Sequence, residues 1–152
     1  MAYISKQKLF QFFQKNPIGI ISTISQENTP HSSNIFYTIN KDFVLYFITK
    51  KEMKKFRDIL KNNHVSITIT EPLTFESVQI EGRAEEIKDH TEMQYVIDTL
   101  SKICKDLKHW PPPISQLTGH SCILKVHITS MRYERFDGDA NYDNDMFYQK
   151  II

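Results

Sequence analysis

Residues 49–57 carry the residue types and spacing best suited to binding a ligand. Thr49 and Glu52 have the separation of a capping box, in which the threonine hydroxyl accepts from the Glu52 amide and the carboxylate reaches back. We therefore expect a strand to end at Thr49 and a helix to begin directly after it. Five cations crowd the first two turns of this expected helix: Lys50, Lys51, Lys54, Lys55 and Arg57.

This placement of the cations is unusual, because basic residues normally favour the last turn of a helix, where the dipole is negative. Positive side chains added to the free N–H groups of a first turn favour the binding of a phosphate. The alternative is a solvated face of lysines, and the charge pattern alone leaves both interpretations open.

Other kinds of site lack the residues that they need. The chain has four glycines, none of them clustered, which excludes a P-loop and a dinucleotide-binding loop. The histidines are scattered with no pair at ligand spacing, so we expect no metal site. The acidic stretch from Asp137 resembles a calcium loop, but Tyr142 and Tyr148 stand where glycine and glutamate are required. No serine or cysteine has an ordered base nearby, so no catalytic residue is assigned.

Length and composition favour a single domain over residues 1–152, with an N-terminal helix over 1–17 and a C-terminal tail over 137–152. The 19 Lys and Arg residues against 18 Asp and Glu residues leave a formal net charge of +1. Because so small a charge creates no basic field, we expect neither nucleic acid nor a membrane as a partner.

Three sequence features favour a cytoplasmic location. No apolar run approaches the length of a membrane span. Residues 1–16 interleave lysines with apolar residues and contain no cleavage site of small residues, unlike a signal peptide. Cys104 and Cys122 both lie in apolar-patterned segments, where reduced core thiols are expected.

Hydrophobic periodicity predicts mostly strands. Leu9, Phe10 and Phe13 share one face of a short opening helix that Pro17 ends. Apolar alternation and turn residues predict six strands, over 18–25, 30–39, 43–49, 65–70, 75–87 and from 122 to about 136.

Two further signals refine this pattern. Gly82 interrupts the fifth strand and predicts a bulge or bend. Asp89 and Glu92 predict the cap of a third helix. The apolar stripe of that helix comprises Met93, Val96, Ile97, Leu100, Ile103, Cys104 and Leu107. The fold class that follows is mainly β (α+β), a six-stranded antiparallel barrel with three peripheral helices.

In this order and spacing, residues 18–87 resemble the flavin-binding split barrel of the pyridoxamine 5′-phosphate oxidase-like superfamily. The likeness rests on IGIISTISQENTPHSSNIFYTI, then DFVLYFITKKEMKKFRDILKNNHVSITI, then VQIEGRAEEI, and more loosely on the final strand. Its most specific part is the strand-Thr-helix unit with its basic pair, followed by N-N-x-V. The resemblance implies a split barrel, bound FMN, and a homodimer with two cofactor sites at the interface, each lined by both chains.

The resemblance also implies where the flavin ring would lie. In the family, the second strand lays its backbone along the pyrimidine edge of the isoalloxazine ring. The matching residues in this chain are Ser33, Asn34, Ile35 and Phe36. The end of the third strand, Ile48 and Thr49, would contact the ribityl and phosphate groups.

Two pairs of side chains complete the cofactor site that the resemblance implies. Lys54 and Lys55 would hold the FMN phosphate. Ser77 stands where the family places a ring-contacting glutamine, so its side chain is shorter. Gln79, two residues further on the same face of the strand, would substitute for it.

The chain departs from the family's best-known enzyme at two places. The oxidase carries a tryptophan on its last strand, where this sequence has Glu134 or Arg135. Its substrate-gripping Arg-x-His corresponds, with an insertion of three residues, to 141–143, followed by Asp145. Carboxylates in place of cations would repel a phosphorylated substrate, so we predict that this chain is not a pyridoxine phosphate oxidase.

Two functions remain open from the sequence. One is an FMN-dependent oxidoreductase acting on a small-molecule substrate or electron donor, in which the protein orients and insulates the flavin. The other is a noncatalytic dimeric module that binds or stores flavin or haem. A haem version needs an axial ligand, for which His31 or His64 would have to face the groove.

Overall fold

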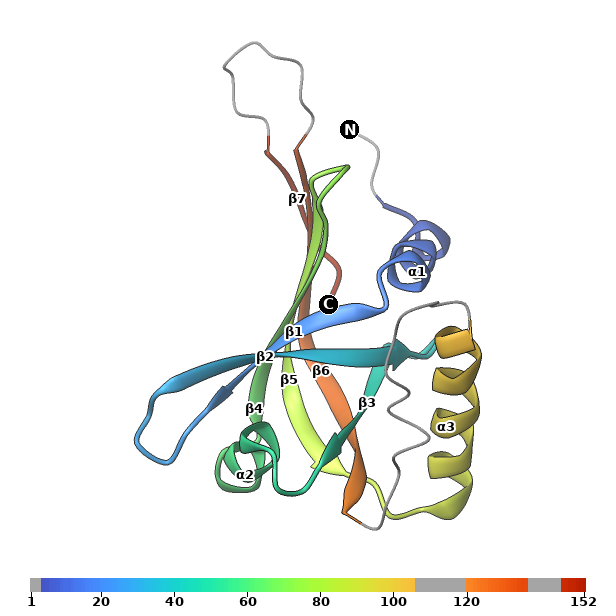
Figure 1. The fold of residues 1–152 in the computed structure, drawn as a ribbon. Helices are drawn as coiled ribbons and strands as arrows, with labels where there is room; N and C mark the ends of the chain where they lie inside the picture. Colours follow the sequence, from blue (N-terminus) through green and yellow to red (C-terminus); the bar gives the residue numbers. More distant parts are fainter. Residues whose placement is uncertain (1–3, 106–119, 137–145) are drawn as a thin grey trace.

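The computed structural model describes residues 4–105, 120–136 and 146–152 (Figure 1). The helices are α1 (Lys6–Lys15), α2 (Lys54–Lys61) and α3 (His90–Lys105). The strands are β1 (Ile18–Ile24), β2 (Pro30–Ile39), β3 (Val44–Lys50), β4 (His64–Glu71), β5 (Glu76–Glu86), β6 (Ser121–Phe136) and β7 (Met146–Lys150). No helix among the described ranges is long and apolar enough to cross a membrane.

Six of the strands close into an antiparallel barrel. The strand order is β3-β2-β1-β4-β5-β6, and β3 pairs again with β6 to complete the ring. The three helices lie around it (Figure 1). The predicted six-stranded barrel with three peripheral helices is therefore confirmed, and every predicted barrel strand is present within a residue or two of its expected bounds.

The long strand β6 takes part in three pairings. Its first half pairs with β3, its residues from Leu124 to Arg135 pair with β5, and its last residues pair with β7. Strand β7 is an addition to the prediction from the sequence, in which residues 137–152 form a tail.

Gly82 lies at an irregularity in the pairing of β5 with β6, as predicted. The register shifts between Glu81 and Gly82. A Cβ atom at Gly82 would lie 2.5 Å from the carbonyl oxygen of His127 on the neighbouring strand. The bulge therefore depends on a residue without a side chain, because only glycine allows the two backbones to approach this closely.

The hydrophobic residues form two clusters. The larger fills the barrel and includes Leu9, Phe12 and Phe13 from α1. The smaller lies outside the barrel wall, where the apolar stripe of α3 covers the outward side chains of β2, β3 and β6. Val96 and Leu100 are its buried members from α3, and Met93, Ile97 and Ile103 pack against it. The predicted stripe is confirmed for these five, while the Cys104 side chain and Leu107 lie outside the described part.

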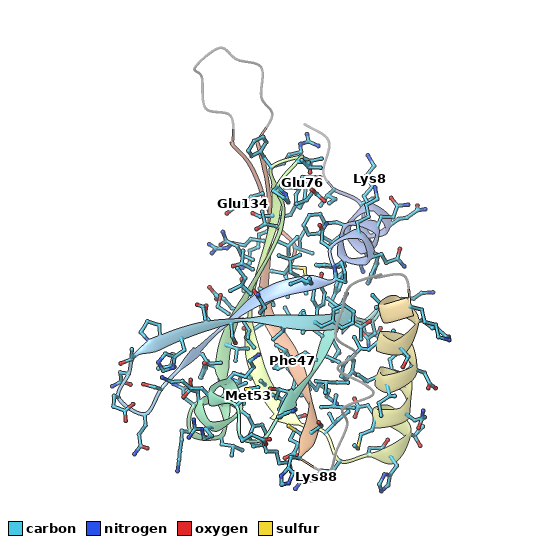
Figure 2. All side chains as sticks on the ribbon, in the orientation of Figure 1. Lys8, Phe47, Met53, Glu76, Lys88 and Glu134 are labelled. Atoms are coloured by element: carbon cyan, nitrogen blue, oxygen red, sulfur yellow. The ribbon has the colours of Figure 1, made fainter. Side chains whose placement is uncertain are left out.

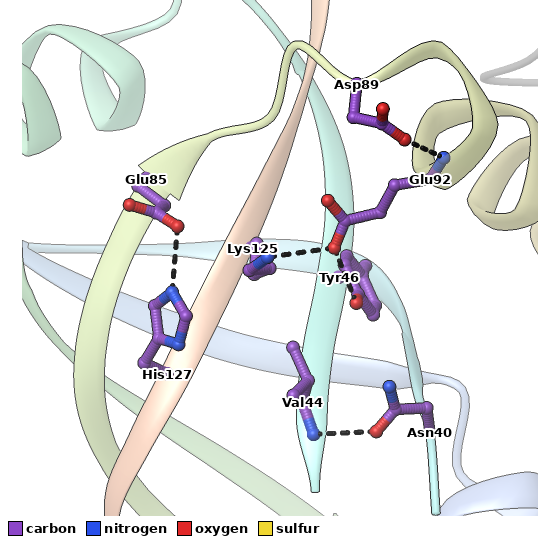
Figure 3. A network of polar contacts seen from close by, with 8 residues as sticks. All are labelled: Asn40, Val44, Tyr46, Glu85, Asp89, Glu92, Lys125 and His127. Carbon is purple, nitrogen blue, oxygen red and sulfur yellow. Dashed lines mark hydrogen bonds and ion pairs between the residues drawn. The ribbon is translucent and has the colours of Figure 1, made fainter. Parts of the chain in front are cut away.

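Polar contacts fix the beginning of α3 to the barrel (Figure 3). Asp89 Oδ1 accepts from the Glu92 amide at 2.7 Å, which confirms the predicted cap. The Glu92 carboxylate does not reach back, because its Oε1 accepts from Tyr46 Oη and from Lys125 Nζ, each at 2.9 Å. The start of α3 is thereby tied to β3 and to β6.

Candidate functional site

Strands β2 and β3 separate at one end, and α2 lies below the opening (Figure 1). They pair only from Tyr37↔Phe47 to Ile39↔Leu45. Before Tyr37, β2 continues along β1, whereas β3 beyond Phe47 continues along β6. The segments that the resemblance assigns to the cofactor, Ser33–Phe36 on β2 and Ile48–Thr49 on β3, therefore form the two sides of a fork.

The predicted capping box at Thr49 is wrong. Thr49 lies inside β3, is buried, and pairs with Cys122 of β6. Its carbonyl oxygen accepts from Cys122 Sγ at 3.5 Å. Helix α2 begins four residues later than the capping box requires, with Met53 as its N-cap and no side-chain cap hydrogen bond. The strand continues to Lys50, because pairing with β6 extends that far.

The five cations consequently divide into different environments. Lys50 ends β3, and Lys51 lies in the turn before α2. Lys51 Nζ forms an ion pair with Glu86 Oε1 at 2.9 Å, and this contact raises the pKa of Lys51. Lys54 and Lys55 begin the helix, and Arg57 is exposed one turn later. Of the five cations, only Lys54 and Lys55 therefore lie at the start of the helix. Met53, the residue before them, is labelled in Figure 2.

Lys55 is the cation that reaches into the fork. Its side chain is half-buried, and Nζ donates to the carbonyl oxygen of Asn34 on β2 at 3.0 Å. Burial lowers the pKa of Lys55, and no carboxylate among the described residues pairs with it. The ammonium therefore retains donors for an anion at this position.

The beginning of α2 adds to this positive potential. Its first turn contains no acidic residue, and within the described chain the amides of Lys54 and Lys55 donate no backbone hydrogen bond. Free amides and two ammonium groups on one helix end form an arrangement suited to a phosphate.

The apolar residues beside the fork pack into the two hydrophobic clusters. Ile35 faces the barrel interior, whereas Phe36 and Ile48 face the cluster under α3. Ile35 and Phe36 are buried and Ile48 is partly buried, so a ligand in the fork would contact mainly backbone groups of these residues. This agrees with the backbone contact that the resemblance implies for β2.

Ser77 and Gln79 lie in a different place, beside Glu134 on β6. Ser77 Oγ lies 3.4 Å and Gln79 Nε2 3.2 Å from Glu134 Oε2, and both groups donate to that oxygen. Arg132 Nη2 donates to Gln79 Oε1 at 2.7 Å. The amide of Gln79 is therefore engaged at both of its ends.

The pairing register gives the separation between these two regions. Asn34 pairs with Ile20, Ile20 with Thr68, and Thr68 with Gln79. Asn34 and Gln79 thus share one row across the sheet, three strand spacings or about 14 Å apart. Figure 2 shows Glu134 above the point where β1 and β2 cross and Met53 below it. The structure brings the β2, β3 and α2 residues together and leaves Ser77 and Gln79 apart from them.

Asp58, Thr23 and His31 form a polar cluster near the lysine pair that the sequence did not predict, called the Asp58 cluster below. Asp58 of α2 is only 6% exposed, and its Oδ2 accepts from Thr23 Oγ1 at 2.8 Å. His31 Nδ1 lies 2.9 Å from the same oxygen. Burial acts to raise the pKa of Asp58, but the contacts with His31, Thr23 and Lys54 outweigh it and hold that pKa below its ordinary value. The partners come from β1 and β2, so sequence spacing gave no signal of them.

No group of three or more potential metal ligands occurs among the residues that the structure describes. His31 is turned toward Asp58, and His64 is exposed at the start of β4. Most of the tail residues compared with a calcium loop and with the substrate-gripping motif fall in 137–145, outside the described part of the chain, whereas Tyr148 lies in β7.

The comparisons agree with this barrel and its fork. A family model described as pyridoxamine 5′-phosphate oxidase matches residues 5–135. No curated protein matches the chain by sequence.

Several solved structures share the fold. A pyridoxamine 5′-phosphate oxidase-related, FMN-binding protein from Nostoc punctiforme is 14% identical, with a TM-score of 0.66 and 100% coverage of both chains. The general stress protein 26 of Bacillus anthracis is 22% identical, with a TM-score of 0.65 and coverage of 96% of this chain and 98% of that one. HutZ, the haem storage protein of Vibrio cholerae, is 15% identical, with a TM-score of 0.63 and coverage of 80% and 88%. At these identities the likeness establishes the fold alone.

Proposed function

The chain belongs to the pyridoxamine 5′-phosphate oxidase family, and on that premise we propose that it binds FMN in the fork between β2 and β3. The residues present fit this cofactor. Lys54 and Lys55 would hold the phosphate, and the backbone of Ser33–Phe36 would border the ring. Ile48 and Thr49 at the end of β3 would border the ribityl chain. When bound, the flavin supplies hydride or electron transfer, for which the protein provides orientation and insulation.

The observation that carries the proposal is the position of Lys55. A half-buried ammonium that contacts a carbonyl oxygen and no carboxylate of the described chain leaves positive charge uncompensated. Desolvation of a cation is unfavourable unless an anion neutralises it, and a phosphate on the same helix end would do so. A solvated lysine face, the alternative from the sequence, does not explain why Lys55 is half-buried and bonded to the backbone of β2.

We further propose a homodimer that covers the outer face of β1. Ile18 and Ile20 are 41% and 48% exposed, and they point out of the barrel in the same rows as Phe36 and Asn34. Two neighbouring exposed isoleucines beside a cofactor fork favour an apolar contact, and a second copy of the chain is the partner that the resemblance implies. Sedimentation should show a dimer, and Ile20→Lys should shift it toward monomer.

The function that these features support best is that of an FMN-dependent oxidoreductase with a small-molecule substrate. No described residue of the fork is an evident general acid or base, which suits hydride or electron transfer. The competing proposal is a noncatalytic module that binds flavin, and the spectral experiment described next distinguishes the two. The haem version has less support, because His31 is turned toward Asp58 instead of the fork.

The visible spectrum of the purified protein tests cofactor binding directly. A yellow protein whose colour is bleached by NADH or NADPH without oxygen supports the oxidoreductase. A yellow protein that neither reductant bleaches favours the noncatalytic module. A colourless protein that takes up no added FMN contradicts the flavin proposal.

Paired lysine variants test the phosphate contact. The double variant Lys54→Ala, Lys55→Ala should weaken FMN binding at least about tenfold, since one charge-assisted contact is worth about 1.5–3 kcal/mol. Riboflavin, which lacks the phosphate, should bind both proteins equally. Lys61→Ala, at the other end of α2, is the matched control and should leave FMN affinity unchanged. A loss below about 1 kcal/mol in the double variant would exclude the phosphate role.

A further inference from the structure

The Asp58 cluster shares helix α2 with the lysine pair and joins that helix to β1 and β2. Helix α2 places Asp58 four residues after Lys54, so both side chains occupy the same helix face. Lys54 acts on Asp58 electrostatically, and its ammonium contributes to the low pKa of that carboxyl. Asp58 is the one acidic residue of α2, and it lies one helical turn from Lys54, which is proposed to hold the phosphate.

Two groups of the β1–β2 hairpin contact this carboxylate, which forms no ion pair with Lys54. Thr23 is 2% exposed and donates through Oγ1, and His31 Nδ1 approaches the same oxygen from β2. Besides His31, two groups act on the Asp58 carboxylate: the neutral hydroxyl of Thr23 from β1 and the ammonium of Lys54 from α2. The hairpin thus competes with Lys54 for Asp58.

We propose that His31 is a positioning residue for the phosphate site, which acts by holding the Asp58 carboxylate away from Lys54. The proposal rests on the proposed function, since it concerns the same lysine pair. With His31 in place, the Lys54 ammonium is available to a phosphate. Without His31, Asp58 forms an ion pair with Lys54 along the helix, and this pair withdraws one cation and presents a negative charge to the ligand.

The first experiment compares FMN with riboflavin in two variants. His31→Leu should weaken FMN binding about tenfold, the size expected when one charge-assisted phosphate contact is lost, and should leave riboflavin binding unchanged. The matched control is His127→Gln, because His127 forms a similar pair with Glu85 at 2.8 Å on the outside of β5 and β6 (Figure 3). The control should change neither affinity.

A second substitution separates positioning from a merely structural role. Adding Asp58→Asn to His31→Leu removes the charge that captures Lys54, so the double variant should regain the FMN affinity of the wild type. Loss of packing alone predicts no such rescue. Thermal melting of each variant confirms that it is folded, and if His31→Leu does not fold, Thr23→Val with and without Asp58→Asn repeats the test from β1.

The binding results distinguish failure of the proposed phosphate site from failure of the proposed role of His31. If the wild-type protein binds FMN no more tightly than riboflavin, the phosphate site itself is absent. If the wild type prefers FMN but His31→Leu keeps that preference, the role of His31 is overturned. An equal loss of both ligands in His31→Leu, or a loss that Asp58→Asn does not rescue, overturns it as well.

Discussion

Lys55 Nζ donates to the carbonyl oxygen of Asn34 across 3.0 Å and so connects the first turn of α2 to β2. The two residues are 21 positions apart in the chain, and they face each other because β3 leaves β2 after Phe47. An anion bound by Lys55 would therefore lie next to the backbone of β2. This contact joins the two parts of the proposed cofactor site, the phosphate end and the ring end.

The protonation of Lys55 should make FMN binding depend on pH. Burial lowers the pKa of Lys55 below its ordinary 10.5, and a bound phosphate favours the charged form. FMN affinity should therefore be full below the Lys55 pKa and fall as the pH rises through it toward 10.5. Fluorescence titrations at increasing pH measure this decline. Lys55→Arg stays charged over the whole range and should give a flat profile, so an equal decline in that variant would contradict the assignment.

Glu92 should contribute to stability through its two partners on the barrel wall. Glu92→Leu leaves Tyr46 Oη and Lys125 Nζ without their acceptor, at a part-buried position, and should lower the free energy of unfolding by about 2 kcal/mol. Glu92→Gln keeps an acceptor oxygen and should cost less. Urea unfolding followed by circular dichroism measures both variants.

The control for Glu92→Leu is Glu85→Leu, which removes the acceptor of the exposed pair with His127 (Figure 3). An exposed pair contributes little, because water screens it. If Glu85→Leu destabilised the protein as much as Glu92→Leu, partial burial would not be the reason for the effect of Glu92→Leu.

The barrel was predictable because its strands follow local rules. Alternation in residues 65–70 and 122–128 marked strands with one buried face, and Gly82 marked the bulge. The capping box was wrong because Thr49 pairs with β6, and no local pattern shows how far such a pairing extends. Strand β7 was missed because only five residues pair with β6 after a polar stretch, too few to show a period.

The site was predictable only in part. The position of Lys54 and Lys55 followed from their spacing after the third strand. The contacts of Asp58 and of Gln79 did not, because each depends on a partner brought from a distant segment, His31 in one case and Glu134 in the other. Register across the barrel decides such contacts, and it is a property of the closed sheet.

Two glycines should differ in how well they tolerate alanine. A Cβ at Gly82 would lie 2.5 Å from the His127 carbonyl oxygen, so the backbone itself must move, at a cost of about 1–3 kcal/mol. A Cβ at Gly19 would meet the side chains of Ile69 and Ile67 at 3.2 and 3.3 Å, where a small adjustment suffices. The melting temperature of Gly82→Ala should therefore be well below that of Gly19→Ala. Equal melting temperatures would contradict the close approach of β5 to β6.

The Cys122 thiol should report on the β3–β6 pairing that holds Thr49. Burial, with a smaller effect from Glu86, raises the pKa of Cys122 to about 11, so the folded protein contains little thiolate at neutral pH. Iodoacetamide should label Cys122 only when β3 and β6 separate, and peptide mass spectrometry distinguishes this site from Cys104. If FMN binds at the end of β3, a concentration 100 times its Kd should slow labelling about a hundredfold, because opening then requires release of the ligand. Rapid labelling of the native protein, or a rate that FMN leaves unchanged, would contradict this link between the cofactor and Thr49.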